Sequence, residues 1–194
     1  MMQNNNQQSG FTLVETLVAI TILLLVITGP MSISARAAKS TSFSSEQVVA
    51  FFLAQEGAEI AQKGRDDILL ANFTNPTTAW NTFTNTSGTF QHCFGANGCG
   101  LELNTNAAGT LKNPVNCSGT SCTLYVDSNT ANTRSRYTHT SSGNTATSYL
   151  RVIKMQKYGE REVKVTSTVY WRTGSQKESQ KVEVETYLFN IYGN

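Results

Sequence analysis

The stretch Gly10-Phe11-Thr12-Leu13-Val14-Glu15, with the apolar run that follows it to Pro30, decides how this chain is organised. From Phe11 to Thr28 every residue is apolar or carries a small hydroxyl, with the single exception of Glu15. About 20 helical residues span roughly 30 Å, the thickness of the hydrocarbon layer of a membrane. A carboxylate near the start of such a span is costly unless it finds a partner, so Glu15 is a candidate functional residue.

Gly-Phe-Thr-Leu-Val-Glu at the start of an apolar helix resembles the processing motif of type IV pilins and the related pseudopilins. The resemblance implies that Gly10 is the last leader residue, that a prepilin peptidase cuts after it, and that the new amine of Phe11 is methylated. It also implies that Glu15 pairs, inside a filament, with the Phe11 amine of a neighbouring subunit, because only cleavage creates that amine. The resemblance covers residues 1–66 well and the remainder in general pattern only.

Two other interpretations of the same stretch stay open. One is a plain membrane anchor in which Glu15 has no role. The other is a secretory signal peptide, because residues 17–27 have the length of its apolar region and Ala35-Arg36-Ala37 is a small-x-small cleavage site. Against a signal peptide, residues 1–10 contain no Lys or Arg, and Glu15 directly precedes the apolar region. The first residue of the mature protein separates the three interpretations. It is Phe11 for the pilin-type motif, Met1 for a plain anchor and Ala38 for a signal peptide.

The distribution of positive charge conflicts with the motif. The first basic residues, Arg36 and Lys39, follow the apolar run, so a charge count alone places the bulk of the chain in the cytoplasm. We let the motif override this count and expect the bulk of the chain on the outer side of the membrane.

Composition bounds the function further. The 194 residues carry a net charge of +2, which does not predict an electrostatic footprint for nucleic acid. The four cysteines, an even number in a translocated domain, predict two disulfides. A zinc site is the alternative. Five residues separate Cys93 from Cys99, however, and zinc-binding cysteine pairs usually have two to four residues between them. Three disulfide pairings are open, and we favour the local one, Cys93 with Cys99 and Cys117 with Cys122.

The expected fold class is α+β, with a long N-terminal helix packed on a C-terminal antiparallel meander and a loop-rich, disulfide-containing region between them. Pro30 is expected to break or kink the helix, since proline removes a hydrogen bond and crowds the preceding turn. Gly64 is a plausible helix stop. The expected divisions are a leader (1–10), a transmembrane or filament-core helix (11–30), an amphipathic continuation (31–65), a loop-rich variable region with the cysteines (66–147) and the β-sheet (148–194).

Alternation of apolar and polar residues predicts the meander. It runs over residues 148–157, 162–171 and 181–190, which short turns connect, and the dry face should cover the helix of residues 46–64. A further short strand is expected at residues 123–126, and another near residues 136–140.

Nothing in the sequence predicts catalysis. His92 adjoins Cys93, but adjacent side chains rarely point toward one another and a cystine is no nucleophile. His139 is expected to be exposed, and Asp66-Asp67 to be a solvated pair after the helix. No phosphate-binding loop and no hydrolase or zinc-protease motif is present. We therefore expect a non-enzymatic protein without cofactor, metal or small-molecule substrate.

The resulting functional expectation is a structural subunit of a type IV pilus-like filament. Its expected partners are other copies of itself, the prepilin peptidase, the inner-membrane assembly platform and the membrane. It would begin as a single-pass protein of the cytoplasmic membrane and end in an extracellular filament at the cell surface. The alternatives are a pseudopilin of a type II secretion system, and an anchored or secreted binding domain that never polymerises.

Overall fold

The computed structural model describes residues 10–104, 109–128, 137–174 and 178–191. The expected leader apart from Gly10, the start of the strand expected at 136–140 and residues 175–177 of the last turn lie outside this range. The chain forms two units, Met1–Ser44 and Ser45–Asn194, which are described separately.

Helix α1 spans Leu13–Ala71 and contains Pro30 in its interior. The break expected at Pro30 is therefore not observed, and residues 31–45 are helical as well. Pro30 removes only its own N–H from the helix, and the φ of proline is compatible with helical geometry. Hydroxyl groups on either side bond back to the helix, from Thr28 to the Leu25 carbonyl at 3.2 Å and from Ser32 to the Gly29 carbonyl at 2.8 Å.

The helix also passes through Gly64, which was expected to stop it. Gly64 is buried, and a Cβ atom there would lie 2.6 Å from the Phe90 ring. The glycine thus allows close packing of a helix that continues for two more turns. α1 ends where the Asn72 amide bonds the carbonyls of Ile68 and Leu69.

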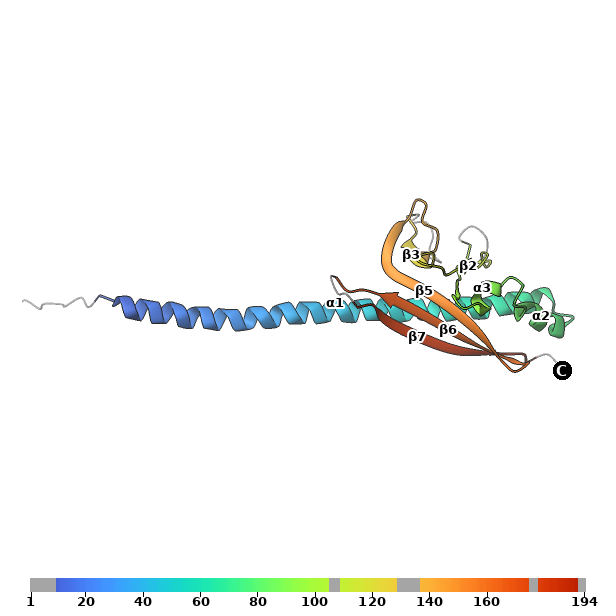
Figure 1. Cartoon of the computed structure of the whole chain (residues 1–194), viewed down its shortest axis with the longest axis horizontal. Coiled ribbons are helices and arrows are strands. Elements are labelled where there is room, and N and C mark those ends of the chain that lie inside the picture. Colours follow the sequence, from blue (N-terminus) through green and yellow to red (C-terminus); the bar gives the residue numbers. More distant parts are fainter. Residues whose placement is uncertain (1–9, 105–108, 129–136, 175–177, 192–194) are drawn as a thin grey trace, which may run out of the picture. The chain divides into compact units, whose positions relative to one another are not determined.

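The second unit contains the expected meander. Strands β5 (Thr145–Tyr158), β6 (Glu162–Trp171) and β7 (Gln180–Phe189) pair antiparallel in that order (Figure 1). Gly159, at φ +71°, makes the tight turn between the first two strands, a conformation that glycine adopts without strain. The alternation in the sequence correctly predicted these strands.

The described residues of the region 66–147 contain more secondary structure than expected. They include helices α2 (Pro76–Phe83) and α3 (Gln91–Phe94) and the short strands β1 (Cys99–Gly100), β2 (Val115–Asn116), β3 (Thr123–Val126) and β4 (Tyr137–Thr138). Within the described residues these strands extend the sheet to seven: β2 pairs with β1, β1 and β3 pair with β5, β4 pairs with β3, and on the other side β6 pairs with β5 and β7 with β6. β5 is long enough to pair with β6 along one edge and with β1 and β3 along the other.

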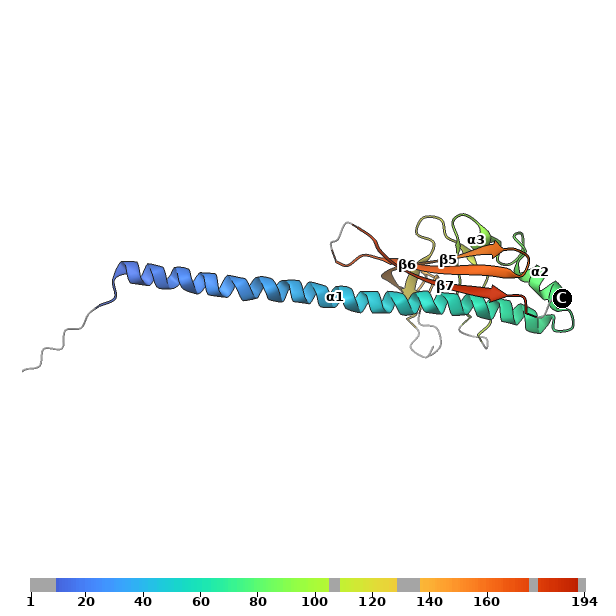
Figure 2. The same cartoon turned by 90° about the horizontal axis from the view of Figure 1, so that it is seen from below.

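One core fills the second unit. The buried face of α1 is made of small residues and a few large ones: Ala50, Leu53, Ala54, Gly57, Ala58, Ile60, Ala61 and Gly64. Ile60 and Ala61 share a hydrophobic cluster with inward side chains of all three long strands, including Ile153, Val163 and Leu188. Figures 1 and 2 show β5, β6 and β7 lying along this part of α1. The sheet therefore covers the helix of residues 46–64, as predicted.

Candidate functional site

The N-terminal motif forms a helix start. The Glu15 amide donates to the Thr12 hydroxyl at 3.3 Å, and the Thr16 amide donates to the Thr12 carbonyl at 3.2 Å. Thr12 is thus the N-cap of α1, and Glu15 is the third helical residue, the place of the acid in a capping box. Phe11 lies just before the first helical turn. Its amine, once released from Gly10, would lie at the positive end of the helix dipole.

The Glu15 side chain is exposed and has no hydrogen-bond or ion-pair partner among the described residues. Around it, the large apolar side chains from Phe11 to Ile27 are 47–80% exposed. Within the described residues, α1 is the one helix long and apolar enough to cross a membrane, with a mean hydropathy of 2.2 in its apolar window. The first unit therefore leaves an apolar surface and one carboxylate to be covered by something else.

The cysteines form the two disulfides that we favoured. Cys93 in α3 bonds Cys99 in β1, and Cys117 bonds Cys122. Each bond closes a short loop, and the described residues include no free cysteine. The Cys117 amide also donates to the Gly98 carbonyl at 3.1 Å, which connects the two disulfide loops.

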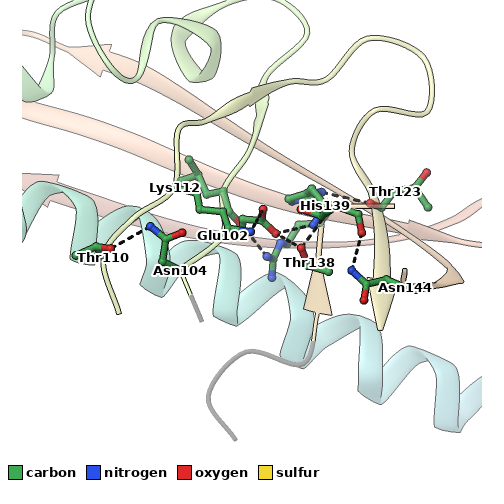
Figure 3. A network of polar contacts seen from close by, with 11 residues as sticks. Glu102, Asn104, Thr110, Lys112, Thr123, Thr138, His139 and Asn144 are labelled. Carbon is green, nitrogen blue, oxygen red and sulfur yellow. Dashed lines mark hydrogen bonds and ion pairs between the residues drawn. The ribbon is translucent and has the colours of Figure 1, made fainter. Parts of the chain in front are cut away.

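A network of polar contacts, which the sequence did not predict, lies in the second unit around the buried Glu102 (Figure 3). One carboxylate oxygen accepts from the Thr138 hydroxyl at 2.5 Å and from the His139 amide at 2.6 Å. The other oxygen accepts from Lys112 Nζ at 2.9 Å. Burial alone would raise the pKa of Glu102, but the bonds from Thr138, Lys112 and the His139 amide outweigh it and hold the pKa below its usual value.

His139 lies in this network and is not the exposed residue we expected. Its Nδ1 atom lies 3.3 Å from the Thr123 carbonyl, and its Nε2 atom is buried without a hydrogen-bond partner among the described residues. Burial, followed by the repulsion of the Arg151 guanidinium, lowers the pKa of His139 from 6.5 to about 4, although Glu102 opposes this effect. The ring is therefore neutral at neutral pH.

Arg151 extends the network to α1. The side chain is fully buried in β5 and donates to the Leu53 carbonyl at 3.1 Å, to Glu56 at 2.6 Å and to the Leu101 carbonyl at 2.9 Å. Removing one partner of a buried charge leaves the other uncompensated, so this contact is costly to break. The sequence held one sign of this buried charge. Arg151 shares the alternation of Tyr149 and Ile153 along the strand, so it lies on the same, dry face of the sheet.

The other candidate residues are not brought together. His92 is partly exposed at the end of α3, and Asp66 and Asp67 form ion pairs with Arg65 and Lys63. Among the residues that the structure describes, no group of three or more His, Cys, Asp or Glu side chains is arranged to hold a metal ion.

Comparison with known families assigns the N-terminal motif. Residues 5–29 match the prokaryotic N-terminal methylation motif, the signature of type IV pilins and pseudopilins. The match includes Gly10, Phe11 and Glu15 and implies processing by prepilin peptidase and association with the membrane. No curated protein and no solved structure matches the chain. The chain thus carries a pilin-type processing signature on an α+β protein whose second unit has two disulfides.

Proposed function

We propose that this chain is a structural subunit of a type IV pilus-like filament, assembled through the N-terminal part of α1. The observation that carries the proposal is the Glu15 carboxylate, which has no partner within the described part of the chain, on an exposed apolar helix that begins at a methylation motif. Packing the helices of several subunits together would cover the apolar side chains. It would also bury Glu15, which then needs a positive partner.

Cleavage after Gly10 supplies that partner. The released amine of Phe11 would lie close to the capped helix start in each subunit, so the amine of one copy can approach Glu15 of the next. The pair neutralises a buried charge and defines the stagger between neighbouring helices, because any other register leaves both charges unpaired. Before assembly, the same apolar helix would anchor the subunit in the cytoplasmic membrane.

The proposal assigns the chain no catalytic activity and no cofactor. Its partners are further copies of the chain, the prepilin peptidase and a membrane assembly platform, and its final location is an extracellular filament. A secretion pseudopilin uses the same motif and the same helix. Recovery of the chain from sheared surface filaments, or only from the cell envelope, distinguishes the two.

The test compares Glu15→Leu with the matched control Glu59→Leu, which removes an exposed carboxylate from the second unit's part of the same helix. We expect both variants to be cleaved after Gly10, as shown by N-terminal sequencing. We expect only Glu15→Leu to remain in the membrane fraction and to be lost from the sheared-filament fraction. Incorporation of Glu15→Leu at the parental level would contradict the pairing mechanism and favour a membrane-anchored domain that does not polymerise.

A further inference from the structure

The surroundings of Glu102 and His139 join segments that are far apart in the sequence. The flanks 101–104 and 109–112 lie antiparallel: the Lys112 amide donates to the Glu102 carbonyl at 3.0 Å and the Asn104 amide donates to the Thr110 carbonyl at 2.7 Å. The Glu102 side chain then reaches β4 through Thr138 and the His139 amide. A single carboxylate thus holds two loop segments together.

The same flanks are attached to β5 by the neighbouring residue. Arg151 donates to the Leu101 carbonyl, one residue before Glu102. The His139 ring packs directly on β1, because a Cβ atom built on Gly100 would lie 2.8 Å from Nε2. The ring therefore fills the space between β1, β3 and the Glu102 carboxylate.

We propose that Glu102 and His139 form an acid-sensitive latch, which holds the flanks 101–104 and 109–112 against β4 and β5 at neutral pH and releases them in acid. The latch does not depend on filament assembly. It would change the surface of the disulfide-containing region while the meander stays folded.

The charged groups around the ring explain the direction of the effect. Lys112 on the flank 109–112 and Arg151 on β5 are both cations, and they act on His139 together with the anion Glu102. Arg151 also has its own carboxylate partner, Glu56, at 2.6 Å on the side of α1. On β3 the ring meets the Thr123 carbonyl, and on β1 it meets Gly100. A proton added to the ring creates a further cation at a half-buried position whose Nε2 atom is shielded from water, whereas release of the segment exposes the ring. Protons therefore favour release.

Glu102 acts in the same direction at lower pH. Lys112, Thr138 and the His139 amide all donate hydrogen bonds to the Glu102 carboxylate. Protonation turns one of its oxygens into a donor, so the carboxyl group accepts these bonds less well. The two residues act over different pH ranges that overlap. His139 contributes as the pH falls from 6.5 to about 4, and Glu102 adds to the effect from its ordinary pKa of 4.5 downward.

Hydrogen exchange of the full chain in detergent micelles tests the latch. The exchange times are scaled to correct for the pH dependence of the intrinsic amide exchange rate. The pKa of the His139 ring is 6.5 when the flanks are released and about 4 when they are closed. Proton linkage then predicts that the released fraction at pH 5 is about 30-fold the released fraction at pH 8. Protection from exchange at the Lys112 and His139 amides should therefore fall between pH 8 and pH 5. Protection of the amides in the β5–β6 ladder should not change. Unchanged protection at Lys112 and His139 would overturn the proposal.

Variants separate the two residues. His139→Gln keeps a polar side chain that cannot take up a proton, so the loss of protection at pH 5 should disappear. His92→Gln, which replaces the other histidine, should behave as the parent. Glu102→Gln should release the flanks already at pH 8. If His139→Gln retains the full response to acid, the latch is wrong.

His139→Gln could also weaken the β5–β6 ladder, and its exchange data would then not isolate the latch. A titration of the His139 ring itself avoids this difficulty. In the full chain without substitutions, labelled at histidine, the His139 ring should titrate near pH 4 in the NMR spectrum. Titration of His139 in the ordinary histidine range would overturn the proposal.

Discussion

The two parts of α1 belong to one helix and yet their apolar side chains are covered in opposite ways. From Phe11 to Ile27 the large apolar side chains are about half exposed or more, whereas from Ala50 to Gly64 one face of the helix is buried in the second unit. Burying one large aliphatic side chain stabilises a fold by about 1.5–3 kcal/mol. The second part gains this within its own unit, and the first can gain it only from lipid or from other helices. One helix can thus contribute to a core along one part and leave an apolar surface uncovered along another, depending on what is packed against it.

The largest effect is expected at the processing site. Gly10→Leu should block cleavage, because the peptidase must approach the backbone closely, and the precursor should accumulate in the membrane at its uncut mass. Within the described residues nothing lies within 4 Å of the Cβ position at Gly10, so the second unit should stay folded. The control is Gly29→Leu, where the Cβ position is equally open. Mass spectrometry of the membrane fraction decides, and normal processing of Gly10→Leu would contradict the assigned site.

The contrast between the parts of α1 can be tested at two glycines. A Cβ at Gly57 would clash with the Ser167 hydroxyl and lie 3.0 Å from Arg151 Cδ, whereas at Gly29 it would meet nothing within 4 Å. Gly57→Val should lower the free energy of unfolding of the second unit by about 3 kcal/mol, because overpacking a core forces strain. Gly29→Val should leave it unchanged in the same denaturant titration. Equal effects of the two variants would mean that the burial difference along the helix is wrong.

Reduction of the disulfides should have a smaller and more local effect. Each closes a short loop and contributes about 2 kcal/mol in the chain-entropy treatment. After reduction and alkylation, hydrogen exchange should increase in residues 90–123, and β5, β6 and β7 should remain protected. Four free thiols in a non-reduced sample from cells would contradict both bonds, and exchange spreading through the meander would show that the loop region and the sheet are one cooperative unit.

Pro30→Ala should have the smallest effect. The helix is continuous at this position, so the substitution restores one missing backbone hydrogen bond without changing the course of the chain. Cleavage and membrane insertion should be unchanged, and filament yield or flexibility should change only modestly. The measurement is the ratio of sheared to membrane-retained protein, beside Glu15→Leu as the variant that loses incorporation. A loss as complete as that of Glu15→Leu would indicate that a bend at Pro30 is needed in the assembled state.

Much of the fold could be predicted because its signals are local. Alternation over residues 162–171 predicted which side chains of β6 face the helix, and Val163, Val165, Ser167, Val169 and Trp171 are all buried. Cysteine spacing favoured the two observed disulfides. The errors came from local signals that packing overrides: Gly64 looked like a helix stop, but its missing side chain makes room for Phe90.

The polar network was missed for a different reason. Glu102, His139 and Arg151 come from two loop segments and a strand, and no motif links their positions in the chain. They meet only because β5 pairs with β6 on one edge and with β1 and β3 on the other. The inward position of Arg151 was readable from the alternation, but its partners were not.

By itself, the sequence determined the features that need no distant partner: the apolar helix with Glu15 near its start, the processing motif and the alternation of the meander. These rest on composition and on spacing along the chain, which report directly whether a face is apolar. Only the tertiary structure decided why Gly57 and Gly64 have no side chain, which partners Arg151 and Glu102 have, and that His139 is half-buried near two cations. Burial and charge pairing depend on residues far apart in the sequence, so they are defined only when the sheet brings those residues together.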